Sequence, residues 1–468
     1  MNTRLILPLA LALAAALTAA PPLQSHRVSA AVAVGSSAAQ DLEQLQGYLD
    51  PAPLGMDVRY AWTLPGGRGE NVRIVDIEFN WNRKHNDLAA AAADPVILVR
   101  GSDPFPEFNV DHGTAVLGEL FAADDGIGVT GIAHRAKLGV INPISDGGSP
   151  NVADAINRAL AVLERGDVIL LEQQSITGPR FNPATGRGLA PVEWDPGVYD
   201  AIRTATSRGI VVVEPSANGF ENLDHKAYNG AFDRAERDSG AIMVGAGMPP
   251  EGVYGPGPDL QRTEESNWGS RVDLQGWGRF VATCGYGDAD PDEGKNSRYT
   301  TIFGGTSSAA AMVAGAAALI QSIVKARGLA PLTPLRLRRL LVSTATPEGR
   351  TSQRVGPRPD LRAAIAALDS PEFAPVPLIS RVSYKRSKGR LTVEGEGFVP
   401  DDSIIEIDGV AVARHKYPSD FIQPSGFTTR IQTKSNVSAK LPRGVTVSIT
   451  VFTPSSGKRS APFLFLNE

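Results

Sequence analysis

The feature that most constrains the fold of this chain is a series of short apolar runs that alternate with helical segments. The runs are rich in β-branched residues and lack apolar–polar alternation, which is typical of strands buried on both faces. The segments 151–166 and 195–209 have helical periodicity, and each ends in a glycine suited to a helix C-cap. This alternation predicts an α/β fold with a mostly parallel sheet and helices on both faces. The apolar runs are "NVRIVDIEF", "AKLGVINPI", "DVILLEQQ", "IVVVEPS" and "AIMVGAGM".

The pattern of apolar and polar residues changes near Ser370. The segment "PEFAPVPLI" is rich in proline and predicts a linker, which we place at 370–378. Beyond it, short alternating segments separated by turn residues predict an all-β module at 379–468. Within this module "LTVEGEGF", "IEIDG" and "VFTPSSG" resemble the IPT/TIG branch of immunoglobulin-like domains, which implies a small β-sandwich. We expect its single histidine, His415, on the surface, and we expect the module to bind another protein or a surface.

The N-terminal segment predicts export. Arg4 precedes an apolar run from Leu5 to about Ala20, and small residues follow. This is the layout of a secretory signal peptide, which we place at 1–30, and a short segment at 31–53 then leads into the α/β region. The run is short for a membrane span, so an N-terminal anchor is the less favoured alternative. We therefore expect a secreted, periplasmic or cell-surface protein with no stable membrane span after signal removal.

Charge and cysteine content exclude several further classes. The chain has 46 Lys and Arg against 50 Asp and Glu, a formal net charge of −4, so its charge does not favour a nucleic-acid partner. Cys284 is its only cysteine, so no disulfide can form within this sequence and stability must come from the packed core. Cys284 lies in "VATCGYGD" with no adjacent helix start, and we do not expect it to act in catalysis.

Three stretches that end or follow predicted strands carry the groups that acyl transfer requires. Asp76 closes "RIVD", His112 lies in "DHGTAVLGEL", and Ser307 lies in "GGTSSAA" before an Ala-rich helical segment. A serine hydroxyl becomes a nucleophile when a base such as imidazole removes its proton, and a buried carboxylate fixes the imidazole tautomer. Asn218 in "EPSANG" follows another strand and offers an oxyanion donor beside the backbone N–H of Ser307. The stretch around Ser307, taken alone, fits a purely structural turn equally well.

Several motifs together are more specific. "HGTAVLGELFA", "GVTGIAHRAKL", "VVVEPSANG" and "GGTSSAAAMVAG" resemble blocks of the subtilisin-like serine peptidases, in that family's order, over a peptidase domain at 54–369. The resemblance implies that Asp76 orients His112, which acts as general base and then general acid. It implies that Ser307 is the nucleophile and that Asn218 holds the oxyanion. The implied activity is that of a secreted serine endopeptidase that forms an acyl-enzyme with protein or peptide substrates and needs no cofactor for the chemistry.

The chain also departs from the family pattern. The Asp block normally continues with a small hydroxyl residue and glycine, whereas here it reads "DIEFNW", so Glu78 adds a carboxylate whose role the sequence leaves open. Ala311 stands where the Ser block usually has proline, and alanine favours the helix. The polar segment "LEQQ" stands where the family has its substrate-lining strand, which leaves the P1 preference open.

Other residues compete for functional roles. His85 in "WNRKHNDL" resembles a structural block of the family, and His134 is expected in a loop. Ser308 is the alternative nucleophile, although the Gly-Thr-Ser frame favours Ser307. The acidic loop at 288–294 could bind structural Ca²⁺, but it lacks the full ligand spacing, so a solvated loop is favoured.

Three other functions remain in competition with the peptidase. A catalytically degenerate subtilase could serve as a binding scaffold, although all four catalytic groups are present. The Ser-Glu-Asp acid peptidases share the Gly-Thr-Ser turn, but "DHGT" argues against them. An α/β-hydrolase is less favoured because "GTSSA" lacks the second glycine of its nucleophile motif.

Overall fold

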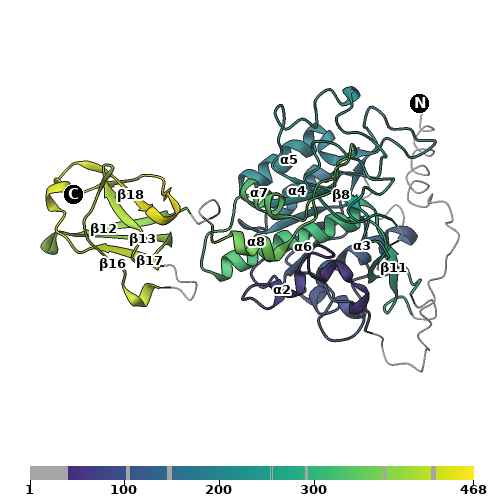
Figure 1. Cartoon of the computed structure of the whole chain (residues 1–468), viewed down its shortest axis with the longest axis horizontal. Helices are drawn as coiled ribbons and strands as arrows, with labels where there is room; N and C mark the ends of the chain where they lie inside the picture. Colours follow the sequence, from purple (N-terminus) through teal and green to yellow (C-terminus); the bar gives the residue numbers. More distant parts are fainter. Residues whose placement is uncertain are drawn as a thin grey trace.

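The computed structural model contains a larger α/β body and a smaller β body at the C-terminal end (Figure 1). The residues whose structure is described are 41–101, 106–144, 150–252, 254–255, 257–289, 294–370, 373, 376–422 and 428–467. The predicted signal peptide at 1–30 lies outside the described residues, as does the first half of the short segment that follows it.

A seven-stranded sheet with the order β2-β3-β1-β4-β7-β8-β9 forms the centre of the larger body. All of its strand pairs are parallel. Every residue of β4, β7 and β8 is buried, which explains their uninterrupted apolar sequences and confirms the predicted fold class. The strands of this body are β1 Arg73–Ile77, β2 Leu98–Val99, β3 Lys137–Ile141, β4 Val168–Leu171, β5 Gln174–Ser175, β6 Ala190–Pro191, β7 Val211–Pro215, β8 Ile242–Gly247, β9 Leu274–Trp277, β10 Val281–Cys284 and β11 Tyr299–Phe303.

Helices cover both faces of the sheet. On one face α4 and α5 pack against alternate strand residues such as Val75 and Val212, and on the other α3 and α6 pack against Ile74 and Val213. The helices are α2 Val58–Trp62, α3 Pro106–Phe121, α4 Val152–Ala159, α5 Pro196–Ser207, α6 Gly305–Ala326, α7 Pro334–Thr344 and α8 Leu361–Ala367. Short 3₁₀ helices lie at Glu43–Leu45, Gly47–Leu49, Asn86–Leu88, Ala91–Ala93, Val192–Trp194, Lys226–Tyr228, Arg386–Lys388, Ser419–Phe421, Ser438–Lys440 and Pro454–Ser456.

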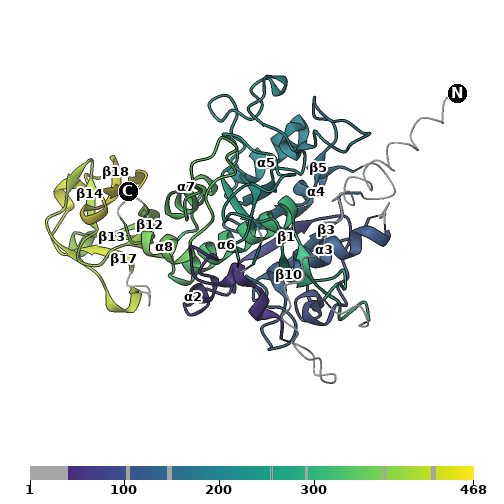
Figure 2. The ribbon, with the colours of Figure 1, turned by 45° about the vertical axis from the view of Figure 1, so that its right-hand side comes forward.

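The helix α6 runs through the middle of the larger body (Figure 2). Its small side chains allow close approach to its neighbours: a Cβ added at Gly315 would lie 2.6 Å from Cγ2 of Ile132. By length and composition α6 could cross a membrane, but its most apolar stretch is completely buried inside the protein. It is therefore a core helix, whose first turn is held in place by packing along its whole length.

One predicted helix is shorter than its sequence pattern suggests. The segment 151–166 was expected to end at Gly166, but α4 ends at Ala159. Beyond it, Oδ2 of Asp167 accepts the backbone N–H of Glu164 at 2.8 Å, and Gly166 donates to the next strand connection. These bonds take the backbone groups that a longer helix would have used. The second helix, α5, does end as predicted, with Gly209 at a φ of +83°.

The C-terminal body consists of antiparallel β-sheets. Strands β12, β13, β17 and β16 form one sheet, and β15, β14, β18 and β19, with β20 beside β18, form another. Their buried faces share one apolar core that includes Val393, Ile405 and Ile449. His415 is half-buried and accepts the N–H of Ile405 at 2.9 Å, so the expectation of a surface histidine was wrong. The strands are β12 Leu378–Lys385, β13 Arg390–Phe398, β14 Ile404–Ile407, β15 Val410–Ala411, β16 His415–Lys416, β17 Thr428–Thr433, β18 Thr446–Thr453, β19 Lys458–Arg459 and β20 Phe463–Leu466.

Candidate active site

Three neighbouring strands bring polar residues to one edge of the sheet. β1, β4 and β7 lie side by side and run parallel, so their carboxyl ends meet. Glu78 directly follows β1, Glu172 directly follows β4, and Asn218 lies shortly beyond β7. His112 on α3 and Ser307 on α6 reach the same edge, because α3 and α6 both pack on one face of the sheet. The structure thus gathers the predicted site residues and adds Glu172.

Ser307 lies in the first turn of α6 and is 5% exposed. The helix begins at Gly305, whose φ of +76° favours glycine. A Cβ at Gly305 would lie 3.2 Å from Nδ2 of Asn218, so the small residue also keeps the asparagine amide close to the serine. Backbone N–H groups in this turn have no partner within the helix and are suited to an anionic oxygen.

The carboxylate of Glu78, which directly follows β1, contacts the imidazole of His112. Its Nδ1 lies 2.6 Å from Oε2 of Glu78, and its ring packs edge-on against Phe303 with 5.6 Å between ring centroids. The other Glu78 oxygen accepts the backbone N–H of Phe79 at 2.5 Å. An Nδ1–H that donates to Glu78 leaves Nε2 as the proton acceptor of the ring.

Asp76 occupies a different position from the one expected of the orienting carboxylate. Its Oδ2 accepts the indole N–H of Trp81 at 2.6 Å, and its Oδ1 is buried without a partner. Among the described residues no hydrogen bond joins Asp76 to His112. Burial, followed by the neighbouring Glu78 charge, raises the pKa of Asp76 well above its usual range. Burial and the Glu78 charge thus both favour the neutral form of Asp76 behind the Glu78–His112 pair.

Asn218 is fixed by both its side chain and its backbone. Its Oδ1 accepts the N–H and the hydroxyl of Thr306 at 3.0 and 3.1 Å, which leaves its amide NH₂ as a free donor at the start of α6. Its backbone N–H donates to Oε1 of Gln174 at 2.5 Å. The chain turns here at Ala217, with a φ of +77°, whereas Gly219 is needed because a Cβ would meet the carbonyl of Leu189.

The polar segment after β4 contributes residues whose roles the sequence left open. Nε2 of Gln173 donates to the carbonyl of Ile77 at 2.6 Å and thereby ties this segment to β1, while Gln174 holds Asn218. Glu172 is 5% exposed, and neither of its carboxyl oxygens has a hydrogen-bond partner. The signal in the sequence was the run of three polar residues at the end of an otherwise apolar strand.

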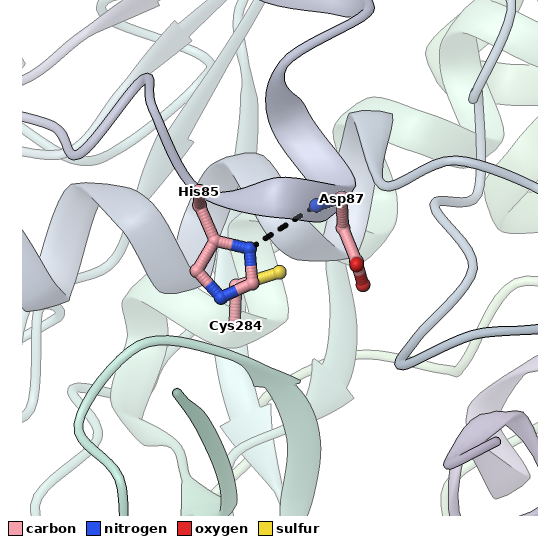
Figure 3. Close-up of side chains that lie close together, drawn as sticks. All are labelled: His85, Asp87 and Cys284. Carbon is pink, nitrogen blue, oxygen red and sulfur yellow. Dashed lines mark hydrogen bonds between the residues drawn. The ribbon is translucent and has the colours of Figure 1, made fainter. Parts of the chain in front are cut away.

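A second group of potential metal ligands, formed by His85, Asp87 and Cys284, is structural (Figure 3). Nδ1 of His85 accepts the N–H of Asp87 at 3.3 Å, and Nε2 lies 2.8 Å from the carbonyl of Arg298, so both ring nitrogens are engaged. Burial raises the pKa of Cys284, which keeps its thiol protonated and unreactive. The two contacts of His85 join the segment around Asp87 to the backbone at Arg298.

The remaining candidates lie away from the reaction chemistry. Ser308 is fully buried, and its hydroxyl donates to the carbonyl of Trp277 at 3.0 Å, so it points into the core. His134 bonds to the carbonyl of Gly131 at 3.0 Å within its loop. Asp288 accepts the N–H of Thr301 at 3.0 Å. Residues 290–293 of the acidic loop lie outside the described residues, so both the favoured solvated loop and the alternative of a calcium site stay untested.

The model of the subtilase family matches residues 67–358 of this chain. An intracellular serine protease from Paenibacillus polymyxa is 27% identical over 303 residues, covering 63% of this chain and 79% of that protein. Subtilisin DY from Bacillus licheniformis is 27% identical over 296 residues, covering 60% of this chain and 86% of that protein. Among solved structures, the Prenylagaramide maturation protease PagA has 19% identity and a TM-score of 0.47, covering 66% of this chain and 98% of that one. Because the family model spans more than half of the sequence, the chain belongs to the subtilase family of subtilisin-like serine proteases.

Proposed function

We propose that this subtilase hydrolyses peptide bonds as an endopeptidase, through an acyl-enzyme formed on Ser307. The observation that carries the proposal is the 2.6 Å contact between Nδ1 of His112 and Glu78. It commits Nδ1 as a donor and leaves Nε2 free to accept the proton of Ser307. Apo structures often hold the nucleophile and base farther apart than a catalytic complex does, so closure of the His112–Ser307 bond accompanies substrate binding.

The reaction follows from these positions. His112 takes the hydroxyl proton while Oγ of Ser307 attacks the carbonyl carbon of the substrate. The resulting oxyanion accepts hydrogen bonds from the Asn218 amide and the Ser307 backbone N–H. His112 then gives the proton to the leaving amine, and a water molecule, activated in the same way, hydrolyses the ester.

We assign the orientation of His112 to Glu78, with Asp76 in a supporting role. The resemblance to the family pointed to Asp76, but the hydrogen bond to the imidazole comes from Glu78. Asp76 is engaged by Trp81 at 2.6 Å instead.

Two further parts of the proposal rest on the sequence. The N-terminal pattern of Arg4 followed by an apolar run supports export, and relatives of this chain bear names that include both an intracellular protease and subtilisins. The β body carries no catalytic constellation among its described residues, which supports a binding role for it.

The test is labelling of the purified protein with a fluorophosphonate, followed by mass spectrometry of the labelled peptide. We expect one adduct, on Ser307, and release of internal peptides from a digested proteome. A folded protein that neither takes the label nor cleaves peptides would favour the binding-scaffold alternative.

A further inference from the structure

Glu172 is a buried carboxyl group without a hydrogen-bond partner at the centre of the proposed site. Its backbone N–H continues the ladder from β4 to β1 by donating to Ile77 at 3.2 Å, so its position is fixed by the sheet. Its side chain is almost fully buried, and both oxygens are left without a partner. A buried carboxyl left in this state destabilises the fold, which suggests a functional reason for it.

The surroundings of Glu172 are those of a proton acceptor for the nucleophile. Its carboxyl group lies near enough to Ser307 for the serine hydroxyl to lower its pKa, although no hydrogen bond has formed between the two side chains. It also lies within 4.8 Å of the facing polar atoms of Glu78 and His112. Among the described residues neither His112 nor Glu172 has a formed hydrogen bond to Ser307. Both bases therefore lie near the nucleophile, and either can take its proton once substrate binding closes the contact.

We propose that Glu172 is a second general base for Ser307, able to take the hydroxyl proton in place of His112. This inference rests on the proposed peptidase function and extends it. In this route the proton passes from Oγ to a carboxylate oxygen of Glu172 as the bond from Oγ to the substrate carbonyl carbon forms. The electron pair of the carbonyl moves to its oxygen. When the C–N bond breaks, the carboxylic acid returns the proton to the leaving nitrogen, which regenerates the carboxylate.

The charge environment makes Glu172 a stronger base than an ordinary carboxylate. Burial raises its pKa well above the usual range, and the facing carboxyl groups of Asp76, Glu78 and Glu119 raise it further, while Ser307 opposes the shift. General base catalysis is most effective when the pKa of the base lies near the working pH. Because the base must be ionised, the Glu172 route gains activity as pH rises through this raised pKa.

A metal ion is the alternative ligand for the same cluster. In a tetrahedral site with bonds of about 2 Å, ligand atoms lie roughly 3.3 Å apart. Oε2 of Glu78 and Nδ1 of His112 are only 2.6 Å apart, so a metal ion would have to displace the proton between them. Proton transfer is the role that preserves the observed contact.

Glu119 on α3 provides a matched control. It is also fully buried with two unpartnered carboxyl oxygens, but it faces Ser308, whose hydroxyl is committed to the carbonyl of Trp277. Glu119 has the smallest influence among the groups that shift the pKa of Glu172, so removing its charge should change the reactivity of Ser307 far less than removing Glu172 does. Comparing the loss of Glu172 with the loss of Glu119 separates the effect of removing a base near Ser307 from the general effect of removing one buried carboxyl group.

The experiment measures the rate of fluorophosphonate labelling in His112→Gln and in double variants that add Glu172→Gln or Glu119→Gln. We expect His112→Gln to label at least about tenfold faster than His112→Gln/Glu172→Gln, and at nearly the same rate as His112→Gln/Glu119→Gln. Equal rates in His112→Gln and its Glu172→Gln double variant would overturn the inference. Circular dichroism checks that each variant is folded.

A second measurement needs no change at Glu172. The labelling rate of His112→Gln, after subtraction of the Ser307→Ala background, should rise with pH in a single titration above the usual range of a glutamate. A flat profile contradicts the inference. Failure of the peptidase proposal itself is distinguishable, because the unmodified protein would then not label at Ser307 at all.

Discussion

The buried carboxyl groups around Arg271 and those around His112 lie in the same α/β body but have very different partners. Arg271 is fully buried, and its guanidinium contacts Glu193 and Asp273 at 2.7 Å each and Glu214 at 3.6 Å. Burial alone would raise the pKa of Glu193, yet the Arg271 charge lowers it below its usual value. Glu193 and Asp273 are thus hydrogen-bonded to a buried cation, as buried charges in a stable core must be, while Glu214 keeps one unpartnered oxygen and has its pKa raised by burial.

The cluster around His112 has no such cation. Glu78 contacts a single imidazole, with Asp76 and Glu172 close by. Both oxygens of Glu172 and one of Asp76 have no partner among the described residues, and burial raises the pKa values of Asp76 and Glu172. Buried carboxyl groups left uncompensated are the form in which acid–base residues can exchange protons near neutral pH. The clearest difference between the two clusters is the buried guanidinium of Arg271, which fits a stabilising role for its own cluster, in contrast to the proposed chemistry at His112.

The largest effect should follow removal of the nucleophile. Ser307→Ala is expected to lower hydrolysis by roughly 10⁶-fold, because no other group can form the acyl-enzyme. The matched control is Ser308→Ala. The Ser308 hydroxyl donates to the carbonyl of Trp277, so its removal should leave labelling almost intact. Peptide hydrolysis assays and circular dichroism measure both. Residual labelling of Ser307→Ala at Ser308 would move the site by one residue.

A second test compares the two carboxyl groups at the end of β1, Asp76 within the strand and Glu78 directly after it. Glu78→Gln should lower kcat by about 10⁴-fold, because the amide can stabilise the wrong tautomer of His112. Asp76→Asn should cost less than about tenfold, because asparagine resembles the neutral acid and can still accept the Trp81 N–H. Steady-state kinetics at pH 7 distinguishes them. The opposite order would return the orienting role to Asp76.

A third test breaks the stable cluster instead. Arg271→Met leaves buried carboxylates without their cation and should lower the free energy of unfolding by about 3–5 kcal/mol. Labelling per folded molecule should not change, because Arg271 contacts neither Ser307 nor His112. Arg158→Met, which removes an exposed pair with Asp154, should cost less than about 1 kcal/mol. Denaturant titration measures both, and equal costs would refute the contrast between the clusters.

A fourth test concerns the oxyanion. Asn218→Ala should lower kcat by roughly 10²–10³-fold with little change in KM, because the amide donates to charge that exists only in the transition state. Asn222→Ala serves as the control, since it removes a side chain that caps a turn at Asp224. Loss of thermal stability with unchanged kcat would make Asn218 a turn former only.

Sequence patterns located the fold better than the site's hydrogen bonds. Uninterrupted apolar runs predicted β1, β3, β4, β7 and β8 because central parallel strands need them. The sequence analysis did not predict the edge strands β2 and β9. β2 has only two residues, and the sequence of β9, "LQGW", contains a polar residue and a glycine. Local pattern carries no information on such short pairings.

The site shows a similar limit. The motifs around His112, Ser307 and Asn218 identified residues that the fold does bring to one edge of the sheet. The identity of the carboxylate that contacts His112 depends instead on side-chain length and on the hydrogen bond from Trp81 to Asp76. The spacing of these residues in the sequence shows neither. Glu172 was visible only as a polar residue at the end of a strand.

The smallest effect is expected from removing the C-terminal β body. Phe373 is only 5% exposed and packs into the core of the larger body, so the boundary for truncation lies after it. A chain ending at residue 376 should label at Ser307 within about twofold of the full rate, since no described catalytic residue contacts the β body. A cavity of about 240 Å³ between the bodies, lined by residues that include Arg165 and Glu396, indicates incomplete packing at this junction.

A chain ending at Ser370 is the matched comparison. It loses Phe373 as well, whose burial stabilises the larger body by up to about 1.5–3 kcal/mol. We therefore expect a lower Tm for this shorter chain and an unchanged labelling rate per folded molecule. Thermal unfolding and labelling of the two truncated chains measure these effects. If both truncations abolished labelling while the proteins stayed folded, the β body would be part of the catalytic unit. The reactivity of Ser307 would then depend on more than the residues of the α/β body around His112.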